Sequence, residues 1–254
     1  MSIDPLSIGA GEFVTRAREI MRDNYVQCLP LLQDGRYQGM ITDQDLINIT
    51  STKSNVTVDG YLRPEVATVK PSTELAVAAR AVIESSTGRL AVVKENGQLV
   101  GVLSIVDLFK GIEDLGVPDI RIREVMRKDF VVAEPGERIS TVWANMIQYN
   151  FRGFPVVRKD QTVIGIITRE DILRRGHVRF ARESESPKWQ PSTVELIMST
   201  PVMTINEDDS LRTAAKIFSE RRFSHLPVLK GNKLTGIINR RDVIKACGRL
   251  VALG

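Results

Sequence analysis

The chain has 254 residues, a formal net charge of +4 and 43% apolar residues. This length allows one large domain or two medium ones, and the composition excludes disordered, collagen-like and disulfide-rich classes. No apolar run reaches the ~18 residues of a membrane span, and no secretory signal is visible, so we expect a cytoplasmic protein with no membrane contact. Cys28 and Cys247 lack metal-site spacing, and we expect two buried, reduced thiols.

One short template occurs four times at near-constant intervals. It consists of Gly, two apolar residues, Thr, Ser or Asn, two variable residues, Asp and an apolar residue. Four matches in register indicate four copies of one unit, with predicted boundaries at 1–55, 56–117, 118–186 and 187–254. The copies are GMITDQDL from Gly39, GVLSIVDL from Gly101, GIITREDI from Gly165 and GIINRRDV from Gly236.

In chain order, the first copy predicts a short strand, a helix and a β-hairpin. The helix has apolar residues at the spacing of one helical face, interrupted by Arg18. An Asp-Gly pair between two apolar runs is typical of a tight hairpin turn. These elements fall at Leu6–Ile8, at Val14, Ala17 and Met21, at LPLL from Leu29, and at Asp34-Gly35.

The second and third copies repeat this order, with a proline at the corner between the first strand and the helix. The second has Val66–Val69, Pro71, the stripe Leu75, Ala78, Ala79 and Val82, and LAVV from Leu90 with Asn96-Gly97. The third has Phe130–Ala133, Pro135, the stripe Ile139, Val142, Trp143 and Met146, and FPVV from Phe154 with Lys159-Asp160.

A charged, Pro- and Ser-containing segment, 174–192, precedes the fourth copy and predicts an exposed linker with a basic helical extension. The fourth copy then follows the same order as the others. Its elements are Val202–Ile205, the stripe Leu211, Ala214, Ala215 and Phe218, and LPVL from Leu226 with Gly231-Asn232.

Each copy therefore predicts the order strand, helix, strand, strand, helix, which is an α+β unit (βαββα). A small three-stranded sheet with two helices leaves one face uncovered, so we expect neighbouring copies to pair and complete a core. The predicted pairs are 1–117 and 118–254.

The strings STPVMTI, HLPVL and GIINRRDV, closed by DVIKA, resemble the CBS domain (cystathionine β-synthase domain). The resemblance covers nearly the whole chain. It implies two CBS-pair modules, each with two clefts that bind AMP, ADP, ATP or S-adenosylmethionine. Four-copy chains resemble the γ subunit of the AMP-activated kinase, in which the modules form a flat disk. The first copy departs most, because it lacks a lead like IMSTP at 197–201.

The Thr-x-x-Asp part of the template has a purely structural explanation. Thr, Ser and Asn are preferred N-cap residues, and an acid three positions later makes a capping box. The same corner can also hold a ligand, since helix N-termini attract phosphates and a carboxylate can accept two ribose hydroxyls. The resemblance implies ribose contacts at Asp45, Asp107, Asp171 and Asp242, and ribose or phosphate contacts at Thr42, Ser104, Thr168 and Asn239.

Further residues are candidates for phosphate or adenine contacts. Arg169, Arg240 and Arg241 lie inside the template, where a solvated helix face is the alternative. Arg89 and His225 precede the apolar runs, and His225 beside a phosphate could switch its charge near neutral pH. Thr68 and Thr204 lie on the first strands, where they could line an adenine pocket or serve as plain strand residues.

No P-loop, complete dinucleotide fingerprint, zinc-site spacing or nucleophile–base pair is present, and the four copies use the entire chain. We therefore expect a regulatory module that binds an adenosine ligand, holds no metal, is not an enzyme and acts on a regulated protein, with a homodimer as a further expectation. One alternative is a nucleic-acid-associated regulator that uses the basic 169–182 region with Arg174, Arg175, Arg179, Arg182 and Trp189. Another is a scaffold without ligand.

Overall fold

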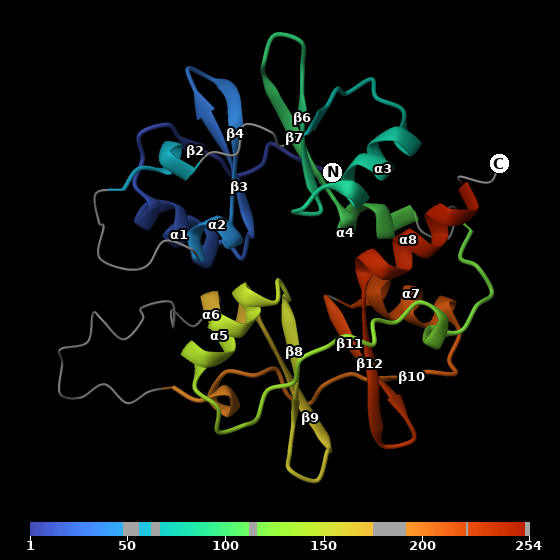
Figure 1. Ribbon diagram of the computed structural model, residues 1–254. Helices are drawn as coiled ribbons and strands as arrows, with labels where there is room; N and C mark the ends of the chain where they lie inside the picture. Colours follow the sequence, from blue (N-terminus) through green and yellow to red (C-terminus); the bar gives the residue numbers. More distant parts are fainter. Residues whose placement is uncertain (48–55, 62–66, 112–115, 175–191, 222, 252–254) are drawn as a thin grey trace, which may run out of the picture. The chain divides into compact units, whose positions relative to one another are not determined.

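The computed structural model describes residues 1–47, 56–61, 67–111, 116–174, 192–221 and 223–251. The described residues form two compact units, Met1–Asp107 and the part of the chain from Leu108 onward. Figure 1 shows the first unit in blue to green and the second in green through yellow to red. Within the described residues, no helix is long and apolar enough to cross a membrane.

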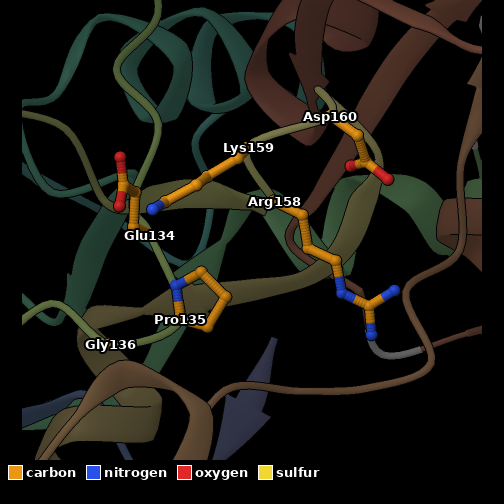
Figure 2. Close-up of a pocket in the computed structure, with 6 residues that line it drawn as sticks. All are labelled: Glu134, Pro135, Gly136, Arg158, Lys159 and Asp160. Carbon is orange, nitrogen blue, oxygen red and sulfur yellow. The ribbon is translucent and has the colours of Figure 1, made fainter.

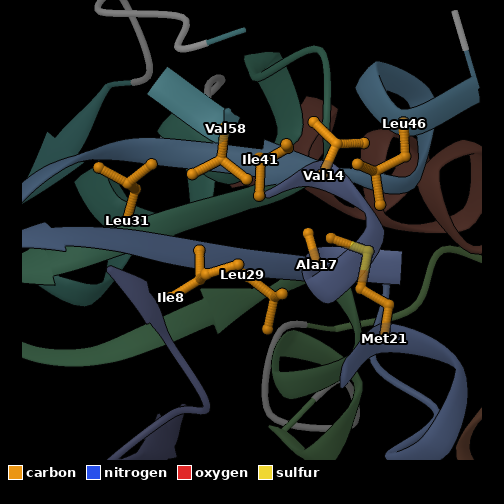
Figure 3. Packing of buried hydrophobic residues seen from close by; sticks show 9 residues of the cluster. All are labelled: Ile8, Val14, Ala17, Met21, Leu29, Leu31, Ile41, Leu46 and Val58. Carbon is orange, nitrogen blue, oxygen red and sulfur yellow. The ribbon is translucent and has the colours of Figure 1, made fainter. Parts of the chain in front are cut away.

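The first repeat is built around a three-stranded sheet. Strand β2 (Ile8–Gly9) is parallel to β3 (Cys28–Gln33), which is antiparallel to β4 (Arg36–Thr42). The β3–β4 turn is tight because Asp34 and Gly35 both adopt positive φ, 51° and 73°. Helices α1 (Val14–Asp23) and α2 (Asp43–Ile47) complete the repeat. Figure 3 shows its core: Ile8, Val14, Ala17, Met21, Leu29, Leu31, Ile41, Leu46 and Val58.

The second repeat has a four-stranded sheet in the order β1-β7-β6-β5. Three of its strands are β5 (Thr68–Val69), β6 (Arg89–Val93) and β7 (Leu99–Ser104), with helices α3 (Leu75–Glu84) and α4 (Ile105–Leu108). The fourth strand, β1 (Ser2–Ile3), comes from the start of the chain and is antiparallel to β7. The short helices η1 (Val58–Tyr61) and η2 (Phe109–Gly111) flank the repeat. A buried cluster of Met40, Ala91 and Val102 joins the sheets of the two repeats.

The second unit contains the third and fourth repeats. The third has the hairpin β8 (Gly153–Val157) and β9 (Val163–Thr168) with helices α5 (Ile139–Gln148) and α6 (Arg169–Arg174). The fourth has β10 (Ile205–Asn206), β11 (His225–Lys230) and β12 (Lys233–Asn239) with α7 (Leu211–Glu220) and α8 (Arg240–Val251). Short helices η3 (Ile122–Glu124) and η4 (Val194–Leu196) precede the two repeats.

The four predicted hairpins and the helix before each are confirmed, whereas the predicted first strands are too long. Strand β10 begins only at Ile205, the last residue of its predicted range. The predicted strand Phe130–Ala133 is wrong, since only Ala133 pairs, through a bridge to Val156 of β8. The equivalent residue of the fourth repeat, Ile205, is likewise the first to pair, so in both repeats the pairing begins at the last residue of the predicted strand.

The predicted apolar stripes are buried in α1, α5 and α7, but Leu75 at the start of α3 is 68% exposed. In the other three helices, a segment from the paired repeat covers this position. Its carbonyl groups accept hydrogen bonds from the backbone N–H groups of Val14, Ile139 and Leu211. No described segment covers α3 in this way, so Leu75 stays in contact with solvent.

Candidate functional site

The end of each hairpin presents the same corner in all four repeats. The template Asp lies in the first turn of the following helix and faces back toward the last residue of the strand. Its Oδ2 accepts the backbone N–H of the residue three positions earlier, at 2.9 to 3.0 Å. The pairs are Thr42 and Asp45, Ser104 and Asp107, Thr168 and Asp171, and Asn239 and Asp242.

The side chain of the capping residue adds a second bond. The hydroxyls of Thr42, Ser104 and Thr168 donate to the same Oδ2 atoms at 2.6, 2.7 and 2.5 Å. In the fourth repeat, the N–H of Asp242 instead donates to Oδ1 of Asn239 at 3.1 Å. The helix-cap interpretation of the template is therefore confirmed in all four repeats.

The four corners differ in exposure. In the first repeat Thr42 and Asp45 are buried, at 3% and 5% exposed. Asp107, Asp171 and Asp242 are half-buried. The last three corners are therefore more accessible to a ligand than the first.

The second carboxylate oxygen faces the paired repeat in two of the corners. Oδ1 of Asp171 accepts the hydroxyl of Ser199 at 3.1 Å, and Oδ1 of Asp107 lies 3.2 Å from the amino group of Met1. Burial raises the pKa of Asp107, but hydrogen bonds from Ser104 and that amino group outweigh it and hold the pKa below its usual value. These aspartates therefore lie at the junction of the two repeats of a unit.

Short segments that precede a repeat, here called lead segments, form these junctions. They are Met1–Ser2 in the first unit and Met126–Arg127 and Met198–Ser199 in the second. Each runs antiparallel across the template strand of the paired repeat, where Ser2 pairs with Val102, Arg127 with Ile237 and Ser199 with Ile166. The expectation that the first copy lacks such a lead is wrong, because Met1–Ser2 occupies the position on β7 that Met198–Ser199 occupies on β9. The similarity of MSIDP to MSTP in the sequence could have revealed it.

The lead segments also explain the template glycine. A Cβ on Gly101 would lie 2.6 Å from the Ser2 carbonyl oxygen, and one on Gly165 would lie 2.7 Å from Sδ of Met198. On Gly236 it would lie 2.7 Å from Sδ of Met126. Only a residue without a side chain allows the crossing segment to approach this closely.

His225 lies beside the third repeat's corner although it belongs to the fourth repeat. A Cβ on Gly153 would lie 3.4 Å from Nδ1 of His225 and 3.3 Å from Cγ2 of Thr168. Burial, followed by the charges of Arg152, Arg127, Arg240 and Arg169, lowers the pKa of His225 to about 3. The His225 ring is therefore neutral at pH 7 in the ligand-free protein, and a charge switch beside a bound phosphate stays a prediction.

The fourth repeat's corner carries opposite charges in a partly desolvated setting. Burial raises the pKa of Asp242, while the Asn239 N–H and the charges of Arg127, Lys245 and Arg241 act against that rise. Burial, together with the charge of Arg152, lowers the pKa of Arg241. Arg127 and Arg152 belong to the third repeat, so both repeats contribute charge to this corner.

Arg169 and Arg240 have a structural role that the sequence interpretation missed. The guanidinium of Arg169, 3% exposed, donates to the carbonyl of Met146 at 2.6 Å. Arg240 donates to the carbonyls of Phe218 and Arg221 at 3.1 and 2.9 Å. Both cations therefore lie at the C-terminal ends of α5 and α7, where they complement the helix dipole. Neither forms the solvated helix face offered as the alternative.

The first unit has different residues at the equivalent positions. Arg89, at the place of His225, donates to Oε1 of Gln27 at 2.5 Å and to the Thr87 carbonyl at 3.4 Å. Asp43, at the place of Arg169, is buried. The adenine-pocket candidates differ in exposure: Thr68 on β5 is exposed, and Thr204, just before β10, is half-buried. Their role stays a prediction.

A surface hollow of about 560 Å³ lies at the opposite end of the third hairpin from the corner. Figure 2 shows its lining, which contains no predicted site residue: Glu134, Pro135, Gly136, Arg158, Lys159 and Asp160. The basic segment of the nucleic-acid alternative lies mostly outside the described residues. That applies to Arg175, Arg179, Arg182 and Trp189.

The family model described as "CBS domain" matches this chain four times, at residues 1–51, 58–114, 122–177 and 194–249. The chain is 25% identical to the uncharacterized protein MJ1225 of Methanocaldococcus jannaschii, over 91% of both chains. The crystal structure of MJ1225, described as a candidate archaeal homologue of g-AMPK, matches with a TM-score of 0.83 over 96% of both chains.

Two further relatives support the same architecture. The uncharacterized protein MJ1404 of the same organism is 26% identical over 96% of this chain, which spans 60% of that protein. An uncharacterized conserved protein from Pyrococcus horikoshii matches with a TM-score of 0.65 over 97% of both chains, at 20% identity. The four-repeat fold is therefore shared along the full length of the chain.

Proposed function

The chain belongs to the CBS-domain family, and on this basis we propose that it is a regulatory protein that senses an adenosine-containing ligand. The ligand is AMP, ADP, ATP or S-adenosylmethionine, as the family resemblance implies. The protein performs no chemical step on it. Binding of the ligand changes how two repeats pack against each other, and a regulated partner protein responds to that change.

One observation carries this proposal: two of the template aspartates, Asp107 and Asp171, lie at a junction between repeats, where the oxygen outside the cap faces the paired repeat. The cap holds Oδ2 of Asp171, while its Oδ1 faces Ser199 of the paired repeat at 3.1 Å. A ribose diol that displaced the Ser199 hydroxyl would satisfy that oxygen and contact both repeats. The cap keeps the carboxylate oriented for such a ligand before it binds.

The junction also supplies a mechanism for signalling. The lead segments pair with the template strands of the other repeat through backbone hydrogen bonds, such as the two between Arg127 and Ile237 at 2.9 and 3.0 Å. A ligand in contact with both repeats favours one packing of the junction over another. Its differential affinity for the two packings sets the size of the response.

Mass spectrometry of small molecules that remain bound to the natively purified full chain would identify the ligand directly. Titration calorimetry with AMP, ADP, ATP and S-adenosylmethionine would then measure its affinity. Saturation at 100 times the dissociation constant should stabilise the fold by about 2.7 kcal/mol, visible as a thermal shift. If none of the four compounds binds or shifts the melting temperature, the result favours the alternative hypothesis that the protein is a scaffold without ligand.

The nucleic-acid alternative has its own test. Filter binding of RNA and DNA at two salt concentrations should give weak retention that is insensitive to salt. Strong retention that falls steeply with added salt would favour the alternative, because release of counterions from phosphates produces that dependence.

A further inference from the structure

The first turn of α3 has an apolar surface that the equivalent turns of the other repeats lack. Leu75, Ala76 and Val77 are all exposed, the leucine at 68% and the valine at 55%. In α1, α5 and α7 the first residue of this turn is at most 4% exposed, and the next two residues are polar. Those polar pairs are Thr15-Arg16, Ser140-Thr141 and Arg212-Thr213. The second repeat therefore presents to solvent a surface that the other repeats either cover or make polar.

In the other three repeats, a short extended segment, here called the covering segment, lies over this turn in one defined way. One of its carbonyl groups accepts the N–H of the first helix residue. Its N–H two positions later donates to the residue before the N-cap, and the residue between them faces the N-cap residue in an antiparallel bridge. The bridges are Phe13 with Thr57, Arg138 with Thr193, and Ser210 with Arg121, and their hydrogen bonds measure 2.9 to 3.1 Å.

Each covering segment also inserts one aliphatic side chain into the repeat that it covers. Val58, Ile122 and Val194 directly follow the bridge residues, and all three are 0% exposed. In the first repeat, Val58 belongs to the same core cluster as Val14 and Ile41. A covering segment thus combines two backbone hydrogen bonds with one buried β-branched residue.

The second repeat has the complementary groups, and no described segment occupies them. Within the described residues, neither the N–H of Leu75 nor the carbonyl of Thr73 has a hydrogen-bond partner. Leu103 is half-buried, whereas its equivalent in the first repeat, Ile41, is 0% exposed. Glu74 takes the N-cap position, and its exposed carboxylate forms no ion pair with a described residue. The place of a covering segment is therefore open on both its backbone side and its apolar side.

We propose that residues 73–77, together with Leu103, form a docking surface for an extended segment of the regulated partner protein. This rests on the proposed function and adds to it where and how the partner is recognised. The partner segment pairs with Thr73 and Leu75 through its backbone, which is the β-strand addition used by many peptide-binding domains.

The docking surface also defines the side chains of the partner segment. A Val or Ile fills the space beside Leu103, as Val58 does beside Ile41. A Lys or Arg one position earlier faces Glu74, since opposite charges directly across an antiparallel pair stabilise it. Ala76 and Val77 replace residues that are polar beside the covering segments, so the apolar contact extends further here. This added area favours a separate protein as the occupant.

The test uses a peptide with blocked ends and the sequence DIRIRE, residues 119–124, which contains the covering segment of the fourth repeat. Its Arg121 provides a charge for Glu74, and its Ile122 provides the aliphatic side chain. NMR titration of the full chain measures the binding, and the amide signals of Leu75 and Val77 should shift. If these signals do not move up to the solubility limit of the peptide, the proposal is wrong.

Variants of the docking surface show whether the peptide binds there. Leu75→Asp and Val77→Asp should each weaken binding at least tenfold and keep the fold, since both side chains are exposed. The matched control is Thr141→Asp, at the exposed position of α5 equivalent to Val77, which should keep wild-type affinity. Glu74→Lys should weaken binding of DIRIRE and strengthen binding of the peptide with R121E. Wild-type affinity in all three folded variants of the docking surface would overturn the proposal.

A fusion of residues 119–125 ahead of Met1 gives a second test, because the same segment directly precedes Met126. The fused segment should occupy the docking surface at high effective concentration and block the free peptide. Undiminished peptide binding to the folded fusion would place the peptide elsewhere and contradict the proposal. Sedimentation identifies another occupant: a wild-type dimer that Leu75→Asp dissociates would show that a second copy, and not a partner protein, covers this surface.

The docking surface and the sensing function can fail separately. If DIRIRE binds with the expected variant effects while no adenosine ligand binds, the docking surface stands and the sensing function fails. If an adenosine ligand binds while DIRIRE does not, the sensing function stands and the docking surface fails.

Discussion

Met198 crosses so close to Gly165 that a Cβ on that glycine would lie 2.7 Å from the methionine Sδ. The two residues belong to different repeats, so the glycine makes room for the paired repeat and not for its own repeat. The same relationship joins Met126 to Gly236. The glycine that begins the template therefore serves the pairing of repeats, while the Asp near its end caps the following helix.

Gly236→Ala should destabilise the second unit by about 1–3 kcal/mol, because the new methyl group overlaps both Sδ of Met126 and the Arg127 carbonyl oxygen. The matched control is Gly136→Ala, where no atom lies within 4 Å of the added Cβ. Chemical denaturation measures both variants. Equal stability of the two would show that the lead segment can move aside at no cost.

Asp171→Ala and Asp242→Ala should each weaken binding of the adenosine ligand at least several-fold. Each variant should also lose about 1–3 kcal/mol of stability, since each carboxylate accepts hydrogen bonds that cap its helix. Calorimetry and denaturation separate the two effects. As a control, Thr168→Ser keeps a hydroxyl donor and should change neither quantity greatly. If both alanine variants fold and bind the ligand with wild-type affinity, then Asp171 and Asp242 do not contact the ribose.

His225 makes stability depend on pH in a defined window. The folded pKa of about 3 lies below the ordinary value of 6.5, so between these limits the unfolded chain binds a proton that the folded chain does not. Stability should therefore fall as the pH decreases from about 6.5 toward 3. In His225→Gln, the slope of the unfolding free energy against pH should decrease by the equivalent of up to one bound proton. Arg152, Arg127, Arg240 and Arg169, which face the ring, stay charged throughout the window.

Denaturation of both chains at several pH values between 4 and 6.5 checks this prediction. His177 is present in both proteins and cancels in the comparison. Parallel stability profiles would mean that the His225 ring is better solvated than its surroundings indicate.

Leu75→Ala and Ile139→Ala truncate the side chain at the same position of the apolar stripe in two repeats, the first residue of α3 and of α5. Ile139 is 4% exposed, and its truncation should cost about 2–5 kcal/mol. Leu75 is 68% exposed, and its truncation should cost less than about 0.5 kcal/mol. Thermal or chemical unfolding of each variant gives the comparison. A large loss for Leu75→Ala would indicate that this side chain is covered in solution.

The sequence predicted the hairpins and the helices before them because their signals are local. Asp34-Gly35 adopts the positive φ angles that such pairs favour, and Ile139, Val142, Trp143 and Met146 all lie on one buried face. The Thr-x-x-Asp cap was also predictable, because its partners are three residues apart. Family resemblance then extended this local pattern to a complete fold.

What the sequence did not reveal depends on contacts between repeats. Leu75 follows the same stripe as Ile139, and only the covering segment distinguishes them. Phe130–Ala133 has the composition of a strand, but only Ala133 pairs with β8, and nothing local in the sequence marks where that pairing begins. The role of Arg169 at the end of α5 could not be inferred either, because its acceptor on Met146 is 23 residues away.

In the second unit, the lead segment of each repeat pairs with the template strand of the other. In a single repeat transplanted into another protein, no lead segment would cover the template glycine. Its own lead segment would have no template strand to pair with. Two consecutive repeats carry both halves of each contact with them. Gene duplication, truncation or grafting of this protein should therefore succeed in steps of two repeats, and experimental fragments should be designed on the same rule.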